Sequence, residues 1–182
     1  MNLLICKSFR KIAMAATCLL LVIFLTDCGY RFSPGGENID KSIQTVYVDN
    51  FSNRTSEANL ENTLRNAFID QFRKSSRFRL ADRREEADAV LKGAINGLSV
   101  SHLSYSTADV AKEDRATLVM ELIFEERRDR RIIWANSAFS WYSDFSVTQA
   151  DTLRTEINRK SALDKLANDL ADRAYRLMMS GF

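Results

Sequence analysis

The chain has 182 residues, of which 46% are hydrophobic and 27% charged, and its formal net charge is +2. An ordinary apolar content with a small net charge excludes a disordered protein, and the weak basic excess argues against a nucleic-acid binder. The length suits one globular domain with at most a small appendage. All three cysteines and the longest apolar run lie within the first 28 residues, so this segment is treated separately.

Residues 1–27 are predicted to be a signal peptide. Lys7, Arg10 and Lys11 give a basic start, and residues 12–25 carry no charge. As a helix this run would span about 21 Å, short of the roughly 30 Å hydrocarbon core of a bilayer. A basic start with a short apolar run is typical of a secretory signal peptide. The alternative is an uncleaved, tilted anchor, and both interpretations place the following domain outside the cytoplasm.

The segment Leu25-Thr26-Asp27-Cys28-Gly29 looks like a bacterial lipobox. In this motif the cysteine becomes the first mature residue and carries a diacylglycerol, so Cys28 is the predicted lipidation site. Asp27 departs from the usual small residue, and the alternative is a chance cysteine at the end of the leader. Gly29 is not the aspartate that retains lipoproteins in the inner membrane, which favours the outer membrane. Several acyl chains would anchor the protein stably.

The mature chain is predicted to be neutral and without a free thiol. Removal of three basic residues and Asp27 cancels the net charge of +2. Cys6 and Cys18 leave with the leader, and lipid would block Cys28. The domain must therefore be stabilised by core packing and not by disulfides, which its length allows.

Residues 28–42, with Pro34-Gly35-Gly36, are predicted to tether the lipidated cysteine to one domain at 43–182. Hydrophobic periodicity then predicts elements in this order: a strand at 45–51, a helix at about 57–75, a strand at 78–80, strands at 89–105, 117–126 and 131–142, and a helix at about 150–179. Gly93 and Gly97 are expected at a bulge or close approach, and Gly181 as a C-cap. The order predicts an α+β fold, a mixed, mostly antiparallel four- to five-stranded sheet with two helices packed on one face.

Residues suited to catalysis are almost missing from the sequence. His102 is the single histidine, which excludes a multi-histidine metal site, and no Gly-x-Ser-x-Gly or phosphate-binding glycine loop occurs. His102 is expected to be a partly exposed strand residue. The acidic pair Glu125-Glu126 is expected to be solvated. We therefore expect a protein that is not an enzyme and has no cofactor or metal.

A cluster of four arginines lies at the predicted hairpin turn between the strands at 117–126 and 131–142. These are Arg127, Arg128, Arg130 and Arg131. Because guanidinium groups bind phosphates and carboxylates through paired hydrogen bonds, the cluster is a candidate contact for an anionic lipid headgroup or an acidic partner. The alternative is a solubilising turn that pairs with Glu125, Glu126 and Asp129.

Aromatic residues gather in and just after the strand that follows this turn. They are expected to be mostly core, and any that are exposed would indicate a protein or lipid interface. The group comprises Trp134, Phe139, Trp141, Tyr142 and Phe145.

Several short motifs in order resemble the LptE family of lipopolysaccharide-assembly lipoproteins. They are Cys28-Gly29-Tyr30-Arg31-Phe32, Val46-Tyr47-Val48, Phe51-x-Asn53-Arg54-Thr55 with Glu57, Leu60 and Glu61, Ala87-Asp88-Ala89-Val90-Leu91-x-Gly93-x-Ile95, Leu103-Ser104-Tyr105, Ile133-Trp134 and the terminal helix ending at Phe182. The resemblance spans the whole mature chain. Asp27 and the arginine-rich turn depart from the pattern.

The resemblance implies a non-enzymatic outer-membrane lipoprotein that plugs an LptD-type barrel and assists delivery of lipopolysaccharide to the outer leaflet. The partners implied are the barrel, lipopolysaccharide and the membrane. The tip arginines could contact lipid A phosphates. Two alternatives remain: another envelope lipoprotein, such as a secretin pilot or a transporter auxiliary subunit, and an envelope hydrolase that uses His102.

Overall fold

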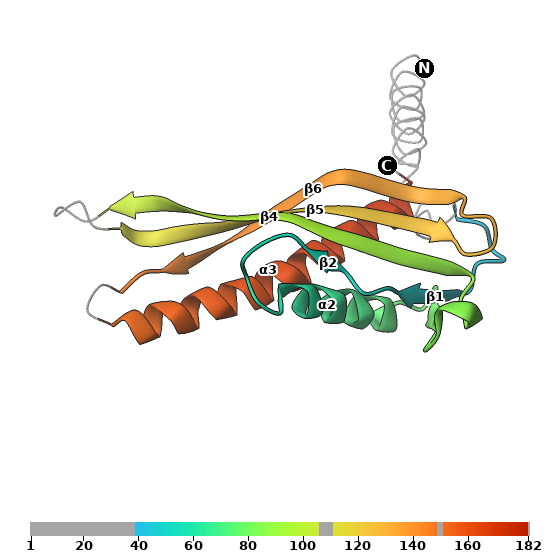
Figure 1. Ribbon diagram of the computed structural model, residues 1–182, viewed down its shortest axis with the longest axis horizontal. Helices are drawn as coiled ribbons and strands as arrows, with labels where there is room; N and C mark the ends of the chain where they lie inside the picture. The colour runs from blue at the N-terminus through green and yellow to red at the C-terminus, as the bar shows by residue number, and fades with distance from the viewer. Residues whose placement is uncertain (1–38, 106–110, 149–150, 182) are drawn as a thin grey trace, which may run out of the picture. The chain divides into compact units, whose positions relative to one another are not determined.

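The computed structural model describes residues 39–105, 111–148 and 151–181, and the predicted lipidation site Cys28 lies outside these ranges. The described residues form two layers. Helices α2 (Leu60–Lys74) and α3 (Thr152–Ser180) cover one face of a mixed sheet (Figure 1). The predicted α+β class is confirmed. Neither helix is both long and apolar enough to cross a membrane.

Six strands make up the sheet. They are β1 (Thr45–Val48), β2 (Ser52–Asn53), β3 (Arg79–Leu80), β4 (Ala89–Tyr105), β5 (Ala111–Glu126) and β6 (Ile132–Ser146), with a 3-10 turn, η1 (Arg84–Glu86), before β4. The order is β3-β1-β4-β5-β6, with β2 also beside β4. The pairs β4–β5 and β5–β6 are antiparallel, whereas the short strands pair in parallel.

The strand count exceeds the prediction because the strand expected at 45–51 ends at Val48 and an unpredicted short strand, β2, follows at Ser52–Asn53. The chain leaves the sheet after Val48 and rejoins it at Ser52. Between them Phe51 is buried and packs edge-on against Phe68 of α2, with ring centroids 5.5 Å apart. A core aromatic thus interrupts a segment whose β-branched and aromatic composition alone predicts one continuous strand.

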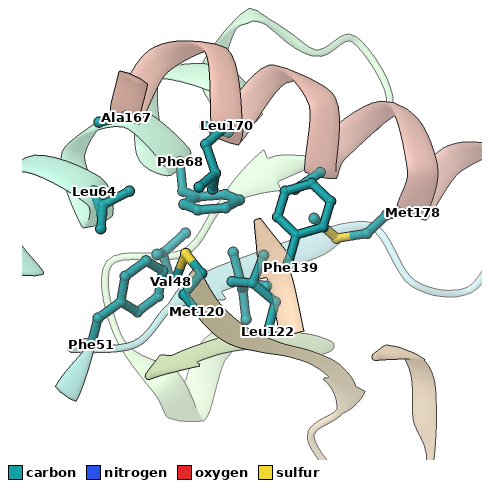
Figure 2. Packing of buried hydrophobic residues seen from close by; sticks show 14 of the residues in the cluster. Val48, Phe51, Leu64, Phe68, Met120, Leu122, Phe139, Ala167, Leu170 and Met178 are labelled. Carbon is teal, nitrogen blue, oxygen red and sulfur yellow. The ribbon is translucent and has the colours of Figure 1, made fainter. Parts of the chain in front are cut away.

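The core lies between the sheet and the two helices. Every second residue of β5 from Ala116 to Phe124 is fully buried, as strand alternation predicts. Figure 2 shows side chains from α2, α3, β1, β5 and β6 converging on this cluster. Ile43, the first residue of the predicted domain, is buried in it, and so is Ile39, so the core includes one residue of the segment predicted as a tether.

Both ends of α3 have recognisable caps. Asp151 accepts a hydrogen bond from the Arg154 backbone N–H at 2.9 Å, which satisfies one free donor of the first turn. Gly181 has φ 76° and donates its N–H to the Leu177 carbonyl at 3.2 Å. The predicted glycine C-cap is confirmed.

The two glycines of β4 have the two predicted roles. Gly97 follows a register shift after Ile95, which marks a bulge, and a Cβ there would meet nothing within 4 Å. A Cβ on Gly93 would lie 2.9 Å from Cδ1 of the buried Phe51 ring. Gly93 therefore permits the close approach that lets Phe51 enter the core.

Replacing Gly93 with alanine is expected to lower the free energy of unfolding by about 1–3 kcal/mol, because the buried Phe51 ring must move. Gly97→Ala is the matched control and should change it by less than about 0.5 kcal/mol. Urea denaturation of both variants measures the difference. Equal stabilities would show that the close packing of Phe51 on Gly93 is not needed.

Candidate interaction surfaces

The hairpin turn between β5 and β6 brings the four predicted arginines to one end of the sheet. The Glu126 N–H donates to the Arg131 carbonyl at 2.9 Å, which closes the turn. Arg130 has φ 59°, a left-handed conformation that suits a tight turn. The turn confirms the predicted hairpin.

Two of the four arginines have partners within the domain. The Arg127 Nε donates to the Ala87 carbonyl at 2.6 Å, which ties the turn to the segment that leads into β4. The Arg131 guanidinium forms an ion pair with Glu126 at 2.8 Å, and this pair raises the pKa of Arg131 above its ordinary value. These side chains therefore have structural partners within the domain.

The other two arginines face solvent. Arg128 and Arg130 are both exposed. Arg128 lies close enough to Asp88 to favour its ionised form, and it lines a small hollow with Asp88 and Glu126. The role of the cluster as an anion contact stays a prediction. Arg131 is also exposed but pairs with Glu126, so Arg128 and Arg130 are the exposed members that form no ion pair among the described residues.

Glu125 corrects the expectation that the Glu125-Glu126 pair is solvated. Its residue surface is only 7% exposed, and its carboxylate pairs with Lys92 of β4 at 2.5 Å. Lys92 and Glu125 are diagonal neighbours across the β4–β5 ladder: Glu125 lies opposite Val90, and Lys92 is two residues further along β4, opposite Ile123. A cross-strand cation thus compensates the burial of this carboxylate, which the linear sequence does not reveal.

Asp88 organises the start of the sheet. Its Oδ2 accepts hydrogen bonds from the Gln44 N–H, the Thr45 N–H and the Thr45 hydroxyl at 3.0, 2.9 and 2.8 Å. Partial burial pushes the pKa of Asp88 upward, but these bonds outweigh it and leave the pKa below its ordinary value. Asp88, which directly precedes β4, therefore fastens the start of β1 to the start of β4.

Asp88→Asn is expected to lower stability at pH 7 by about 1–2 kcal/mol, because a carboxylate accepts these bonds more strongly than an amide. The pKa of Asp88 is lower in the folded protein than in the unfolded chain. The stability that its carboxylate contributes is therefore fully present above about pH 4 and is lost as the pH falls through the folded-state pKa. The difference between wild type and variant should shrink in acid. Thermal melts at pH 7 and pH 3 check this, with the exposed Asp82→Asn as control; a constant difference would contradict the assignment.

The aromatic group divides between core and surface. Trp134, Phe139 and Phe145 are buried, as expected. Trp141 is half-buried, and Tyr142 is 43% exposed. This division bears on the prediction that exposed members of the group indicate an interface.

Trp141 and Tyr142 form a stacked ladder with two arginines. The centroids of the two stacked rings are 5.6 Å apart. The Arg173 guanidinium of α3 lies 4.4 Å from the Trp141 ring centroid, and the Arg115 guanidinium lies 3.8 Å from the Tyr142 ring centroid. Arg115 also pairs with Asp144 through two bonds of 2.7 and 2.9 Å. Stacked aromatics and arginines of this kind are enriched in protein interfaces.

The loop motif that precedes α2 has a structural role. The Asn53 side-chain amide donates to the Glu57 carbonyl and to Glu61, both at 2.8 Å, and its oxygen accepts from the Thr55 N–H and hydroxyl. Glu57 in turn pairs with Arg159 of α3. These contacts fix the loop between β2 and α2 against the other helix.

His102 lies on β4 with its side chain 57% exposed, as predicted, and its Nδ1 is 2.6 Å from Oδ1 of Asp114. Asp114 is only 8% exposed. No group of three or more potential metal ligands occurs in the ranges that the structure describes. The pair therefore reads as a cross-strand contact of the β4–β5 hairpin.

These features define a two-layer α+β domain with charged and aromatic surface clusters. The LptE family model, described as lipopolysaccharide-assembly, matches residues 43–178. The chain belongs to this family, and the predicted resemblance is confirmed. No curated protein sequence matches the chain.

Solved structures share the fold. Protein XCC0632 from Xanthomonas campestris aligns with a TM-score of 0.56 and 11% identity, covering 82% of this chain and 89% of that one. The rare lipoprotein B from Shewanella oneidensis aligns with a TM-score of 0.50 and 14% identity, covering 75% of this chain and 95% of that one. Protein CT253 from Chlamydia trachomatis aligns with a TM-score of 0.50 and 10% identity, covering 76% of this chain and 99% of that one. At these identities the likeness concerns the fold alone.

Proposed function

We propose that this chain is a non-enzymatic, lipid-anchored subunit of the outer membrane that plugs an LptD-type barrel and assists lipopolysaccharide transport and assembly. The observation that carries the proposal is the family match, which runs from Ile43 to Met178 and so includes every described helix and strand for nearly its whole length. Lipopolysaccharide assembly is the activity that the family description names.

The surface suits a polar environment such as a barrel lumen. Several ion pairs lie on this surface, among them Arg115–Asp144, Arg131–Glu126 and Lys165–Asp169. The predicted neutral charge of the mature chain avoids strong repulsion from either sign of lumen charge. Barrel lumens are polar, and exposed Arg and Tyr side chains offer contacts to their walls.

The N-terminal leader and Cys28 supply the proposed membrane attachment. Cleavage before Cys28 and acylation of its sulfur would hold the domain at the outer membrane through residues 28–38. Mass spectrometry of the mature N-terminus tests this directly. We expect a lipid-modified Cys28 in wild type and none in Cys28→Ala; an unmodified N-terminus, or one that starts elsewhere, would contradict it.

Arg128 and Arg130 are the proposed contact for lipid A phosphates. Both are exposed at the tip, whereas Arg127 and Arg131 are engaged by the fold. Arginine forms charge-assisted hydrogen bonds to phosphate, so two accessible guanidiniums on one turn suit a phosphorylated headgroup. The alternative, a purely solubilising turn, predicts no effect of these two side chains on lipid binding.

Affinity purification from outer membranes tests the partnership. The full chain carries a C-terminal tag, and proteins that co-purify in mild detergent are identified by mass spectrometry. We expect an LptD-type barrel as the main partner. Recovery of a secretin or an inner-membrane transporter in place of the barrel would favour the alternative lipoprotein functions and contradict this one.

A further inference from the structure

The far half of β4 has a strand on only one side. β1 pairs with β4 up to Leu91, and β2 pairs with it at Ala94 and Ile95. Beyond the bulge, the segment Gly97–Ser101 pairs with β5, while no strand of the described ranges pairs with its other side. We call Gly97–Ser101 the open edge.

The backbone of the open edge presents hydrogen-bonding groups to the vacant side. The Ile95 carbonyl accepts from the Arg54 N–H at 3.0 Å and so points away from β5. The partners of Ile95, Leu98 and Val100 on β5 are every second residue of that strand: Met120, Leu118 and Ala116. The backbone groups of Ile95, Leu98 and Val100 therefore all point to the same side of β4. Leu98 and Val100 therefore direct their N–H and C=O groups outward, as an incoming strand requires.

The open edge begins at a bulge but carries neither of the residue types, charged or proline, that commonly protect an edge against strand pairing. Natural edges carry charges or prolines, yet no Lys, Arg, Asp, Glu or Pro occurs from Gly97 to Tyr105 in a chain that is 27% charged. Ser99 and Ser101 are exposed, and Val100 is 44% exposed. An uncharged incoming strand would therefore leave no unpaired charge opposite this edge.

Exposed apolar side chains of α3 lie on the helix side of the same end of the domain. Leu153 and Ile157 are 71% and 59% exposed although they share one helix stripe. They line a hollow with Leu60 of α2, and a second hollow, lined by Gly97, Leu98 and Val100, shares Glu57 and Arg159 with the first. Alternate side chains of an added strand would point toward this layer, so apolar residues suit those positions.

We propose that the open edge accepts an extended, uncharged strand with alternating apolar and polar residues, supplied by the barrel partner; this rests on the proposed function. A five-residue pairing buries far less than the roughly 800 Å² per partner of a stable dimer. The strand must therefore belong to a protein that already holds this chain through other surfaces. A barrel that encloses the domain meets that condition, whereas a second copy does not.

Val100→Pro tests the proposal because it deletes an outward N–H without removing a bond to β5. Val100→Thr keeps the N–H and the branched shape, and is the matched control. Both variants are expressed as full chains with thermal melts as a check on folding. We expect Val100→Pro to recover at least fivefold less barrel than Val100→Thr from outer membranes. Equal recovery would overturn the inference while leaving the proposed function intact. Recovery of no barrel by the wild type would contradict the proposed function itself.

Hydrogen exchange of the unmutated chain covers the case in which the proline variant does not fold. Amides of the peptide that contains Leu98 and Val100 should exchange at least tenfold more slowly in the barrel complex than in the free chain. Unchanged exchange would overturn the proposal. So would light scattering that shows a dimer of the free chain that Val100→Pro abolishes, because the occupant would then be a second copy.

Discussion

Replacing Phe68 with alanine is expected to lower the free energy of unfolding by about 3–5 kcal/mol, the range for removing a fully buried phenylalanine. Phe68 lies in the middle of α2 with 0% of its surface exposed, and its ring meets the edge of Phe51. Figure 2 places it in the cluster that joins α2 and α3 to the sheet. Since domains of this size are stable by about 5–15 kcal/mol, the variant should lose a large part of its stability.

Chemical denaturation followed by circular dichroism measures this loss. The control is Leu153→Ala, which removes an apolar side chain that is 71% exposed on α3 and should change stability by less than about 0.5 kcal/mol. Similar losses for the two variants would mean that the packing of α2 on the sheet does not hold the fold.

The double variant Arg128→Ser with Arg130→Ser is expected to weaken binding of purified lipopolysaccharide about tenfold or more without a change in melting temperature. A hydrogen bond to a charged group contributes about 1.5–3 kcal/mol to the binding free energy, and solvent exposure reduces this figure. The loss of two such contacts is therefore expected to weaken binding at least about tenfold. Stability should be retained because both side chains are exposed, whereas Arg127 and Arg131 carry the contacts to Ala87 and Glu126.

Binding of a fluorescent lipopolysaccharide to the purified chain, at low and high salt, measures this effect. Arg154→Ser with Lys160→Ser removes the same charge from exposed positions of α3 and serves as control. The tip variant should also show a weaker salt dependence than wild type. If both double variants weaken binding equally, net charge explains the result and the tip is not a specific contact.

Local patterns predicted the regular elements well. β4 has the predicted bounds, because alternating apolar residues continue through its two glycines and its bulge. β5 and β6 are longer than predicted. The start of β5 contains Glu113, Asp114 and Arg115, whose charges suggest a loop, but Arg115 is paired across the ladder with Asp144 and so tolerates a strand.

The surface features depended on contacts between distant segments. Lys92 buries Glu125 only once β4 and β5 align, and the Trp141–Tyr142 stack acquires its arginines from β5 and from α3. Leu153 and Ile157 belong to the apolar periodicity of α3, yet the structure leaves both exposed. Periodicity identifies the stripe, but it does not show that α2 begins at Leu60 and leaves the first turns of α3 uncovered.

The most direct test of the account is depletion of this chain from growing cells, with lipopolysaccharide at the cell surface as the measurement. Newly made lipopolysaccharide is labelled, and its accessibility to a probe that cannot cross the outer membrane is followed as the protein is lost. The account predicts that surface lipopolysaccharide falls while total synthesis continues, and that the wild-type chain restores it. Undiminished delivery to the surface in fully depleted cells would contradict the role in lipopolysaccharide assembly.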